Sequence, residues 1–292
     1  MSFHLLHPRP FFLALFVLAA ITLSSGVQFA EEPTAGIPRN ALPFEVAGLQ
    51  NAKIFAAGRS LYVEVKAAAE NSSLKIPRLA NVVQSMRWQS VPESKISLQP
   101  EPEHWIIHHG KPPAANGDVL IIELDAPPTV FDGSTVTHAD KDGLIFLPAK
   151  LATTSGENLR YEPQPHKNTV GYWSNVNATA TWKLSTSQKG SYEIDILQGC
   201  GTGHGGSIVD IQIGIESLVF TVEETGHFQN FVWRTVGTVE LSADESVTLK
   251  LAPQSKPGGA VMDVRAVRLS RPGTERSFES ELAAPDALPK KQ

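Results

Sequence analysis

Residues 192–215 read "YEIDILQGCGTGHGGSIVDIQIGI": two stretches of alternating apolar and polar residues, joined by a glycine-rich segment. Alternation with a period of two is typical of β-strands that bury one face and expose the other. In the second stretch the apolar set is Val209, Ile211, Ile213 and Ile215. The segment therefore predicts a strand, a glycine-rich connection and a second strand.

The glycine segment carries Gly201, Gly203 and Gly206 at the spacing of a dinucleotide-binding fingerprint. That motif binds pyrophosphate where the glycine turn opens a helix, because the N-terminal amides and dipole of the helix hold the phosphates. Here a β-branched, alternating stretch follows instead. The sequence argues against a nucleotide site and favours a tight connection for which glycine supplies the backbone freedom.

The only cysteine, Cys200, lies in this segment, four residues before His204. A cysteine nucleophile needs a base and an activating environment, and a structural zinc takes four ligands. The segment supplies neither a third catalytic partner nor a second ligand pair. We expect Cys200 to be a small packing residue, and we leave open that His204 reaches the rim of a ligand site.

Strand patterns dominate the rest of the chain, and no amphipathic helix of convincing length is present. "VTLKL" (247–251) alternates in the same way, as does "LYVEV" (61–65), and spacers such as "SADES" favour turns. Short strands with frequent turns predict β-sandwiches. The expected fold class is all-β, with β-sandwich domains at about 40–130 and 142–272. The proline-containing segment 123–143 is the expected linker.

Both ends of the chain differ in composition from these domains. Arg9, the apolar run 11–21 and the small residues after it predict a signal peptide over 1–30, with cleavage within 26–30. The run is shorter than the roughly 20 residues of a membrane-spanning helix, although an uncleaved anchor is an alternative. The expected localisation is secreted or periplasmic. The polar tail 273–292 is expected to be disordered.

The net charge of the chain limits the kinds of molecule that it is expected to bind. One of the 25 basic residues, Arg9, lies in the predicted leader, which leaves 24 basic against 30 acidic side chains. A mildly acidic chain without basic blocks is a poor candidate for nucleic acid or for an anionic membrane surface. A single cysteine also excludes an internal disulfide framework.

Signals for catalysis are weak. No Gly-x-Ser-x-Gly motif occurs. Glu223 and Glu224 are adjacent and would point to opposite faces of a strand, and nothing singles out the carboxyl pair that a glycosidase needs. In "HWIIHH", His104 and His108 share a strand face, which we interpret as solvated histidines, with a weak surface metal site as the alternative. We predict no catalytic residues.

Two polar aromatic clusters are the best candidates for a binding site. They are "VGYWSNVNAT" (170–179) and "ETGHFQNFVWR" (224–234). Exposed aromatic rings stack on the apolar faces of sugars, and amide or imidazole side chains bond their hydroxyls. The candidate ligand-binding residues are Tyr172, Trp173, Asn175, Asn177, His227, Phe228 and Gln229. The alternative for the aromatic residues is a place in the core, which we expect for Trp182.

The second half also resembles a known family. The segments "NTVGYWSNVNATATWKLSTSQKGSYEIDILQGCG" (168–201), "GGSIVDIQIG" (205–214), "EETGHFQNFVWRTVGTVELSADESVTLKL" (223–251) and "GGAVMDVRAVRL" (258–269) resemble, in order, carbohydrate-binding modules of the family 6 and 35 type. The resemblance implies a galactose-binding-like β-jelly roll. It also implies a sugar cleft flanked by Tyr172 or Trp173 and by Phe228.

This sequence departs from the family pattern in several places. "NAT" at 177–179 replaces Gly-Asp-Trp, Phe228 replaces the usual tryptophan, and the ligand-binding asparagine of the last glycine-rich loop is replaced near 260–261. Asp263 matches the calcium-site aspartate of the family, but Lys150 stands where the acidic partner is usual. We therefore expect no cofactor, and calcium is the alternative.

Residues 73–125 resemble, more weakly, the C-terminal β-sandwich of family 29 α-L-fucosidases. The catalytic barrel of such enzymes takes roughly 250 residues, for which this chain has no room. The resemblances imply a secreted, non-catalytic carbohydrate-binding protein that binds a glycan or polysaccharide and works beside a secreted glycosidase or sulfatase. The alternatives are an extracellular protein-interaction or structural module and, less favoured, a hydrolase-related accessory protein with residual activity.

Overall fold

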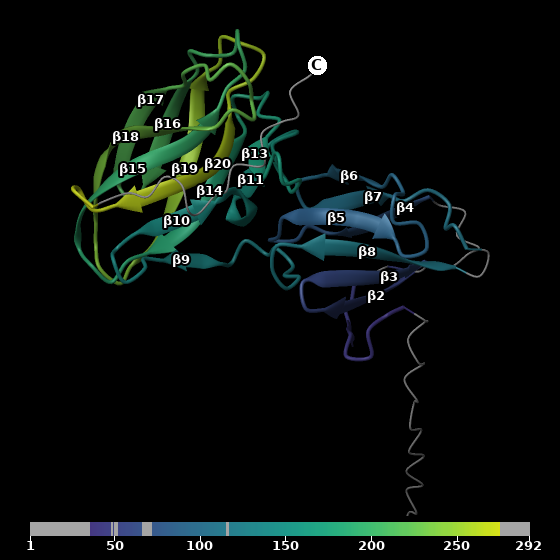
Figure 1. Cartoon of the computed structure of the whole chain (residues 1–292). Coiled ribbons are helices and arrows are strands. Elements are labelled where there is room, and N and C mark those ends of the chain that lie inside the picture. The colour runs from purple at the N-terminus through teal and green to yellow at the C-terminus, as the bar shows by residue number, and fades with distance from the viewer. Residues whose placement is uncertain (1–35, 48, 50–51, 66–71, 115–116, 275–292) are drawn as a thin grey trace, which may run out of the picture. The chain divides into compact units, whose positions relative to one another are not determined.

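The computed structural model describes residues 36–47, 49, 52–65, 72–114 and 117–274, and these are almost entirely strands and turns (Figure 1). Within these ranges the helical structure is the 3₁₀ turn η1 (Ala149–Leu151). None of the described helices has the length and apolar character that a membrane crossing needs. The predicted signal peptide and the tail from residue 275 onward lie outside the described residues.

The first half forms two antiparallel sheets. The larger sheet has the order β1 (Leu42–Pro43), β2 (Ala52–Ala57), β3 (Ser60–Val65), β8 (Asp118–Leu124) and β5 (Val83–Trp88). The smaller has the order β4 (Ser73–Pro77), β7 (His104–His108) and β6 (Ser97–Pro100). Alternate residues of β3, Leu61, Val63 and Val65, are buried, as the "LYVEV" pattern predicts.

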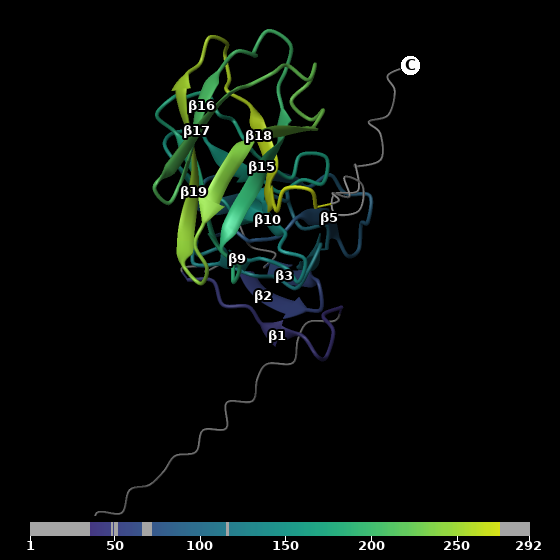
Figure 2. The same ribbon diagram turned by 90° about the vertical axis from the view of Figure 1, so that its left-hand side faces the viewer.

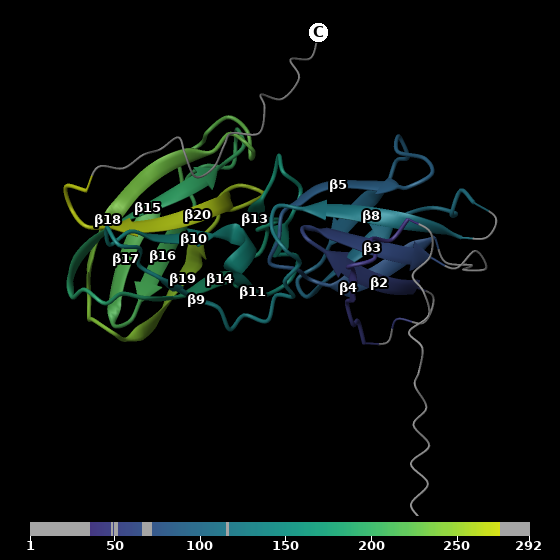
Figure 3. The same cartoon turned by 60° about the horizontal axis from the view of Figure 1, so that its bottom comes forward.

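The second half forms a jelly roll of two further sheets. One has the order β12 (Arg160–Glu162), β13 (Thr169–Gly171), β20 (Asp263–Ser270), β15 (Gly190–Gly199) and β18 (Val232–Leu241), and β10 (Ile145–Pro148) also pairs with β20. The other has the order β11 (Thr153–Ser155), β14 (Thr179–Ser185), β19 (Ser246–Ser255), β16 (Ile208–Ile213) and β17 (Glu216–Thr221). Figures 2 and 3 show β15, β18 and β20 in one layer and β16 and β19 in the other. The all-β prediction of two sandwiches is confirmed.

The stretch 192–215 forms β15, a connection and β16, and the two strands lie in different sheets. Val209, Ile211 and Ile213 are buried, as predicted. Ile215 is not: it is fully exposed, at 104% of its reference area, because β16 ends at Ile213 and the chain turns into β17. Strand connections that cross from one sheet to the other enclose the core between the layers.

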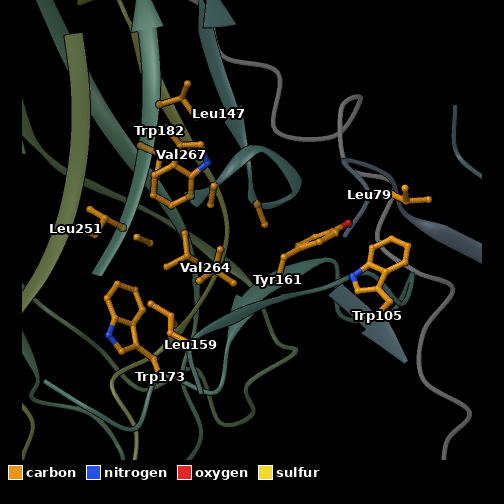
Figure 4. Packing of buried hydrophobic residues seen from close by; sticks show 14 of the residues in the cluster. Leu79, Trp105, Leu147, Leu159, Tyr161, Trp173, Trp182, Leu251, Val264 and Val267 are labelled. Carbon is orange, nitrogen blue, oxygen red and sulfur yellow. The ribbon is translucent and has the colours of Figure 1, made fainter. Parts of the chain in front are cut away.

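The core of the second sandwich is built around two tryptophans, Trp173 and Trp182, drawn in Figure 4. Each is 1% exposed, and Trp182 donates a hydrogen bond from Nε1 to the carbonyl oxygen of Pro148 at 2.9 Å. Val264 and Val267 of β20 belong to the same buried cluster. The expectation that Trp182 lies in the core agrees with this burial.

The expected linker, 123–143, contains a strand. Within it, β9 (Val136–His138) pairs in parallel with β14. In the same segment, Asp125 accepts a hydrogen bond from the ammonium of Lys150 at 2.6 Å and from the backbone N–H of Val82 at 2.9 Å. These contacts lie within one compact unit of the chain, Pro33–Gln292.

Candidate functional site

A cleft of about 550 Å³ lies at the end of the jelly roll where β13 ends and β20 begins. Four chain segments meet around it: residues 158–167, the loop after β13, the turn before β18 and the entry to β20. The lining residues are Asn158, Glu162, Lys167, Tyr172, Trp173, Ser174, Phe228, Gln229, Ala260 and Asp263. The fold thus brings the aromatic loop and the Thr-Gly-His-Phe-Gln turn to one cavity.

Tyr172 presents its ring to solvent at this cleft. The side chain is 51% exposed, and the backbone has a φ of 60°. A left-handed backbone is unfavourable for a bulky residue, and such residues cluster at functional sites. Asn158, on the facing segment of the lining, has a φ of 66°. Two residues with left-handed backbones thus line one cavity.

Trp173 also lines the cleft, but its side chain is buried. Its ring is 1% exposed, and Nε1 donates a hydrogen bond to the carbonyl oxygen of Ala178 at 3.1 Å. The two neighbouring rings therefore differ sharply in exposure, 51% for Tyr172 and 1% for Trp173. Trp173 therefore belongs to the core beneath the cleft, and the expectation that it is an exposed stacking ring does not agree with this burial.

Phe228 is half-buried, and the lack of a side chain at Gly201 leaves room for its ring. A Cβ atom on Gly201 would lie 2.8 Å from the Phe228 ring, so a side chain at 201 would displace it. His204 contacts the same ring, with 5.2 Å between centroids, and its Nδ1 accepts a hydrogen bond from the backbone N–H of Ala260 at 3.1 Å. His204 therefore supports two lining residues without being one of them. The glycine-rich connection shapes the cleft wall.

The predicted polar ligands divide into two groups. Gln229 lines the cleft. The side chains of Asn175 and His227 are engaged in their own loops: Asn175 Oδ1 accepts from the N–H of Asn177 at 2.9 Å, and His227 Nδ1 accepts from the N–H of Gln229 at 3.1 Å. Asn175, Asn177 and His227 are not among the lining residues, and the side chains of Asn175 and His227 shape the two loops that carry Tyr172 and Gln229.

The floor of the cleft holds two carboxyl groups that sequence patterns did not single out as a pair. A Cβ atom on Gly171 would lie 2.7 Å from Glu162 Oε2 and 3.1 Å from Asp263 Oδ1, so both groups converge over this glycine. Lys167 Nζ lies 2.6 Å from Glu162 Oε1. Glu162 is in a three-residue strand, too short for a recognisable pattern, and it meets Asp263 only through the sheet order β12-β13-β20.

The ionisation of Asp263 reflects this crowding. Burial raises the pKa of its carboxyl well above the usual range, and the negative charge of Glu162 raises that pKa further. Lys167, a hydrogen bond from Gln229 and Arg265 act in the opposite direction. A desolvated carboxyl in a cleft beside a second carboxyl is a recognised mark of a functional site.

The residues around Asp263 do not fit a calcium ion, which the family resemblance left as an alternative. Lys150, which replaces the usual acidic partner, is bound to Asp125 at 2.6 Å. Glu162, beside Asp263, is already paired with the ammonium of Lys167. Calcium takes six to eight oxygen ligands, and the described part of the chain has no group of three or more His, Cys, Asp or Glu residues placed to hold a metal.

Cys200 has the character of a packing residue. Its side chain is fully buried, and burial, followed by the charges of Glu224 and Asp263, raises the pKa of the thiol to about 11. A thiol in this state is protonated at neutral pH and unreactive. Since His204 Nδ1 bonds the N–H of Ala260, the geometry does not support a Cys/His nucleophile pair.

The other groups considered for chemistry have structural partners. Glu223 forms an ion pair with Arg234 at 2.8 Å, and Glu224 accepts a hydrogen bond from the N–H of Gly203 at 2.8 Å. His108 lies 3.4 Å from the amide oxygen of Gln99. His109 is buried rather than solvated and packs edge-on against Trp88, with 5.5 Å between ring centroids.

Comparisons with known proteins show similarity to solved structures only. No family model matches the sequence, and no curated protein matches it. The family 35 carbohydrate-binding module from Clostridium thermocellum is 17% identical, with a TM-score of 0.34, over 44% of this chain and 98% of that one. The C-terminal CBM6 of LamC, a laminarinase from Zobellia galactanivorans, is 19% identical, with a TM-score of 0.33, over 44% and 99%.

The α-L-fucosidase from Vibrio sp. strain EJY3 matches a longer part of the chain. It is 13% identical, with a TM-score of 0.33, over 77% of this chain and 40% of the fucosidase. This chain thus spans well under half of that enzyme's length. The structural neighbours therefore include both kinds of protein that the sequence resembles. Identities and TM-scores this low transfer neither a ligand nor an activity.

Proposed function

We propose that this chain is an exported, non-catalytic glycan-binding protein and that the cleft is its binding site. The observation that carries the proposal is that one cleft is lined by the exposed Tyr172, by Phe228 and by several polar side chains. Sugars have apolar C–H faces, which stack on aromatic rings, and hydroxyls, which both donate and accept hydrogen bonds. Gln229 and Lys167 supply donors, and Glu162 supplies acceptors.

The placement of the carboxyls favours binding over hydrolysis. Glycoside hydrolysis needs two carboxyls on either side of the scissile bond. Glu162 and Asp263 instead converge over Gly171 on the same floor, and Glu162 is tied to Lys167. A sugar above this floor would contact both groups from one side, which suits recognition of hydroxyls. A secreted glycosidase or sulfatase would supply the catalysis.

A glycan array probed with residues 31–292 tests the proposal. We expect retention of the wild type and loss of retention in Tyr172→Ala and Gln229→Ala. Asn177→Ala is the matched control, because its side chain lies in the same loop as Tyr172 but does not line the cleft. Circular dichroism and thermal unfolding would show that the variants fold. Equal retention of Tyr172→Ala and wild type would contradict the proposal.

A second candidate function rests on a different surface. Ile208, Ile215 and Val219 are exposed along the edge strand β17 and its neighbour β16, at 36%, 104% and 54%. Exposed edge strands and apolar patches are common sites of association with other chains. The chain would then be a protein-interaction module. Association abolished by Val219→Lys and unaffected by sugars would support this candidate.

A further inference from the structure

One face of the Tyr172 ring is covered by a positive charge from outside the cleft. The guanidinium carbon of Arg160 lies 3.5 Å from the centroid of the ring, whereas Arg160 is not among the residues that line the cavity. An arginine stacked on an aromatic face attracts the negative charge of the π system. The ring is therefore held by Arg160 on one side.

The backbone places Arg160 for this contact. In the β12–β13 ladder Arg160 lies opposite Gly171, and Tyr172 is the next residue along the chain. Arg160 Nη1 donates a hydrogen bond to the carbonyl oxygen of Asn158 at 3.1 Å, which orients the guanidinium plane. Asn158 and Tyr172 both have left-handed backbones. Cation, ring and both strained residues thus form one local unit.

Packing alone does not hold this ring. Tyr172 is 51% exposed, and its backbone does not continue β13. The other nearby cation, Lys167, lies 5.4 Å from the ring centroid and is paired with Glu162. An exposed ring that is free to change rotamer would lose conformational entropy when a ligand binds, and prior orientation removes that cost.

We propose that Arg160 is a positioning residue that holds the Tyr172 ring in place for the ligand. The inference rests on the proposed glycan-binding function for its ligand, but the contact itself is independent of it. Because Arg160 occupies one face, a sugar stacks on the opposite face only. Arg160 therefore contributes to affinity through Tyr172 and not by touching the glycan.

A double-mutant cycle tests whether Arg160 acts on glycan binding through Tyr172. On the glycan that the array identifies, we expect Arg160→Ala to weaken binding about threefold to tenfold, the range of a stacked cation. Arg160→Lys should restore part of the affinity, because an ammonium can also lie over the ring. In the Tyr172→Ala background, Arg160→Ala should have no further effect. A persistent effect in that background would mean that Arg160 contacts the ligand directly, and would overturn the proposal.

Arg271→Ala is the matched control. Arg271 lies 5.8 Å from the ring of another tyrosine, Tyr192, next to the opposite end of β20 from Asp263. It should leave glycan binding unchanged. A loss of affinity in this control equal to that of Arg160→Ala would indicate a general charge effect and would count against the proposal.

A readout without ligand separates the two proposals. The chain has four tyrosines, so 3-fluorotyrosine labelling gives few fluorine resonances, and Tyr172→Phe identifies that of Tyr172. In Arg160→Ala this resonance should move toward the free-tyrosine position while the other three stay unchanged. An unchanged resonance overturns the positioning role. If the wild type binds no glycan but the resonance shifts, the proposed function fails while the ring contact stands.

Discussion

The ammonium of Lys167 lies 2.6 Å from Oε1 of Glu162, and both side chains line the cleft. Glu162 is 3% exposed, so this is an ion pair largely removed from water. Asp263 also approaches Gly171, and the ammonium of Lys167 forms its ion pair with Glu162. Burial and the nearby charge of Glu162 together raise the pKa of Asp263, whereas Lys167, a hydrogen bond from Gln229 and Arg265 lower it.

Replacement of Lys167 by Met should weaken both stability and binding. Removing one partner of a buried ion pair leaves the other charge uncompensated. We expect a loss of about 2 kcal/mol in the free energy of unfolding at pH 7, less than for a fully buried pair because Lys167 is partly exposed. Glycan affinity should fall about tenfold. Urea unfolding and titration calorimetry measure the two effects, and Lys141→Met, at an exposed pair with Asp142, is the control.

Stability should depend on pH through Asp263. Its pKa is raised in the folded state, so the folded protein binds the proton more tightly than the unfolded chain does. The slope of stability with pH is then negative from about pH 4, the pKa of an unfolded carboxyl, up to the folded pKa. Asp263→Asn should remove this decline. Urea midpoints between pH 4 and pH 8 measure it, and a decline unchanged in the variant would contradict the assignment.

Tyr172 and Trp173 should respond in opposite ways to truncation. Trp173→Ala removes a buried ring and should cost about 3–5 kcal/mol in unfolding free energy. Tyr172→Ala should cost less than about 1 kcal/mol, since the ring is half exposed. Tyr172→Gly should be more stable than Tyr172→Ala, because glycine adopts a positive φ without strain. Thermal unfolding of the three variants checks the order.

The buried ion pair Arg268–Asp195 gives a test of the jelly-roll core away from the cleft. Arg268 Nη2 lies 2.7 Å from Asp195 Oδ2, across β20 and β15, and Thr235 donates to Asp195 Oδ1 at 2.7 Å. Asp195→Ala should lower stability by about 3–5 kcal/mol, because it removes a hydrogen-bonded carboxylate from beside a buried guanidinium. Glycan binding of the folded fraction should be unchanged.

Cys200 should resist modification in the native protein. Its thiol is fully buried and has a pKa of about 11, so thiolate is scarce at pH 8. Iodoacetamide should label it slowly in buffer and rapidly in urea, as measured by mass spectrometry. Rapid native labelling would show that the core at the β15 end opens.

Local patterns in the sequence predicted several of the strands. Period-two alternation predicted β15, β16 and β19, since a strand with one buried face needs that spacing. It failed at Ile215, because alternation continued beyond the residue at which the chain turns. It also missed β9, whose three residues lie in a segment otherwise rich in turn formers.

The candidate site was predictable only in part. Clusters of aromatic and polar residues in the sequence indicated Tyr172, Phe228 and Gln229, and all three line the cleft. The sequence could not distinguish Tyr172 from Trp173, because which of two adjacent rings is buried depends on the tertiary packing around them. Asn175 and His227 were predicted as ligands from their side-chain chemistry, and the structure shows that one acceptor atom of each binds a backbone N–H of its own loop.

By itself, then, the sequence determined an all-β chain and the loops that carry aromatic residues, since both follow from side chains near one another in the chain. The tertiary structure determined which residues meet in the cleft. Glu162 and Asp263 are far apart in sequence and meet because β13 pairs with β12 on one side and with β20 on the other, over a glycine that leaves space for both carboxyls. Long-range strand pairing leaves no local pattern, so only the folded chain shows this floor.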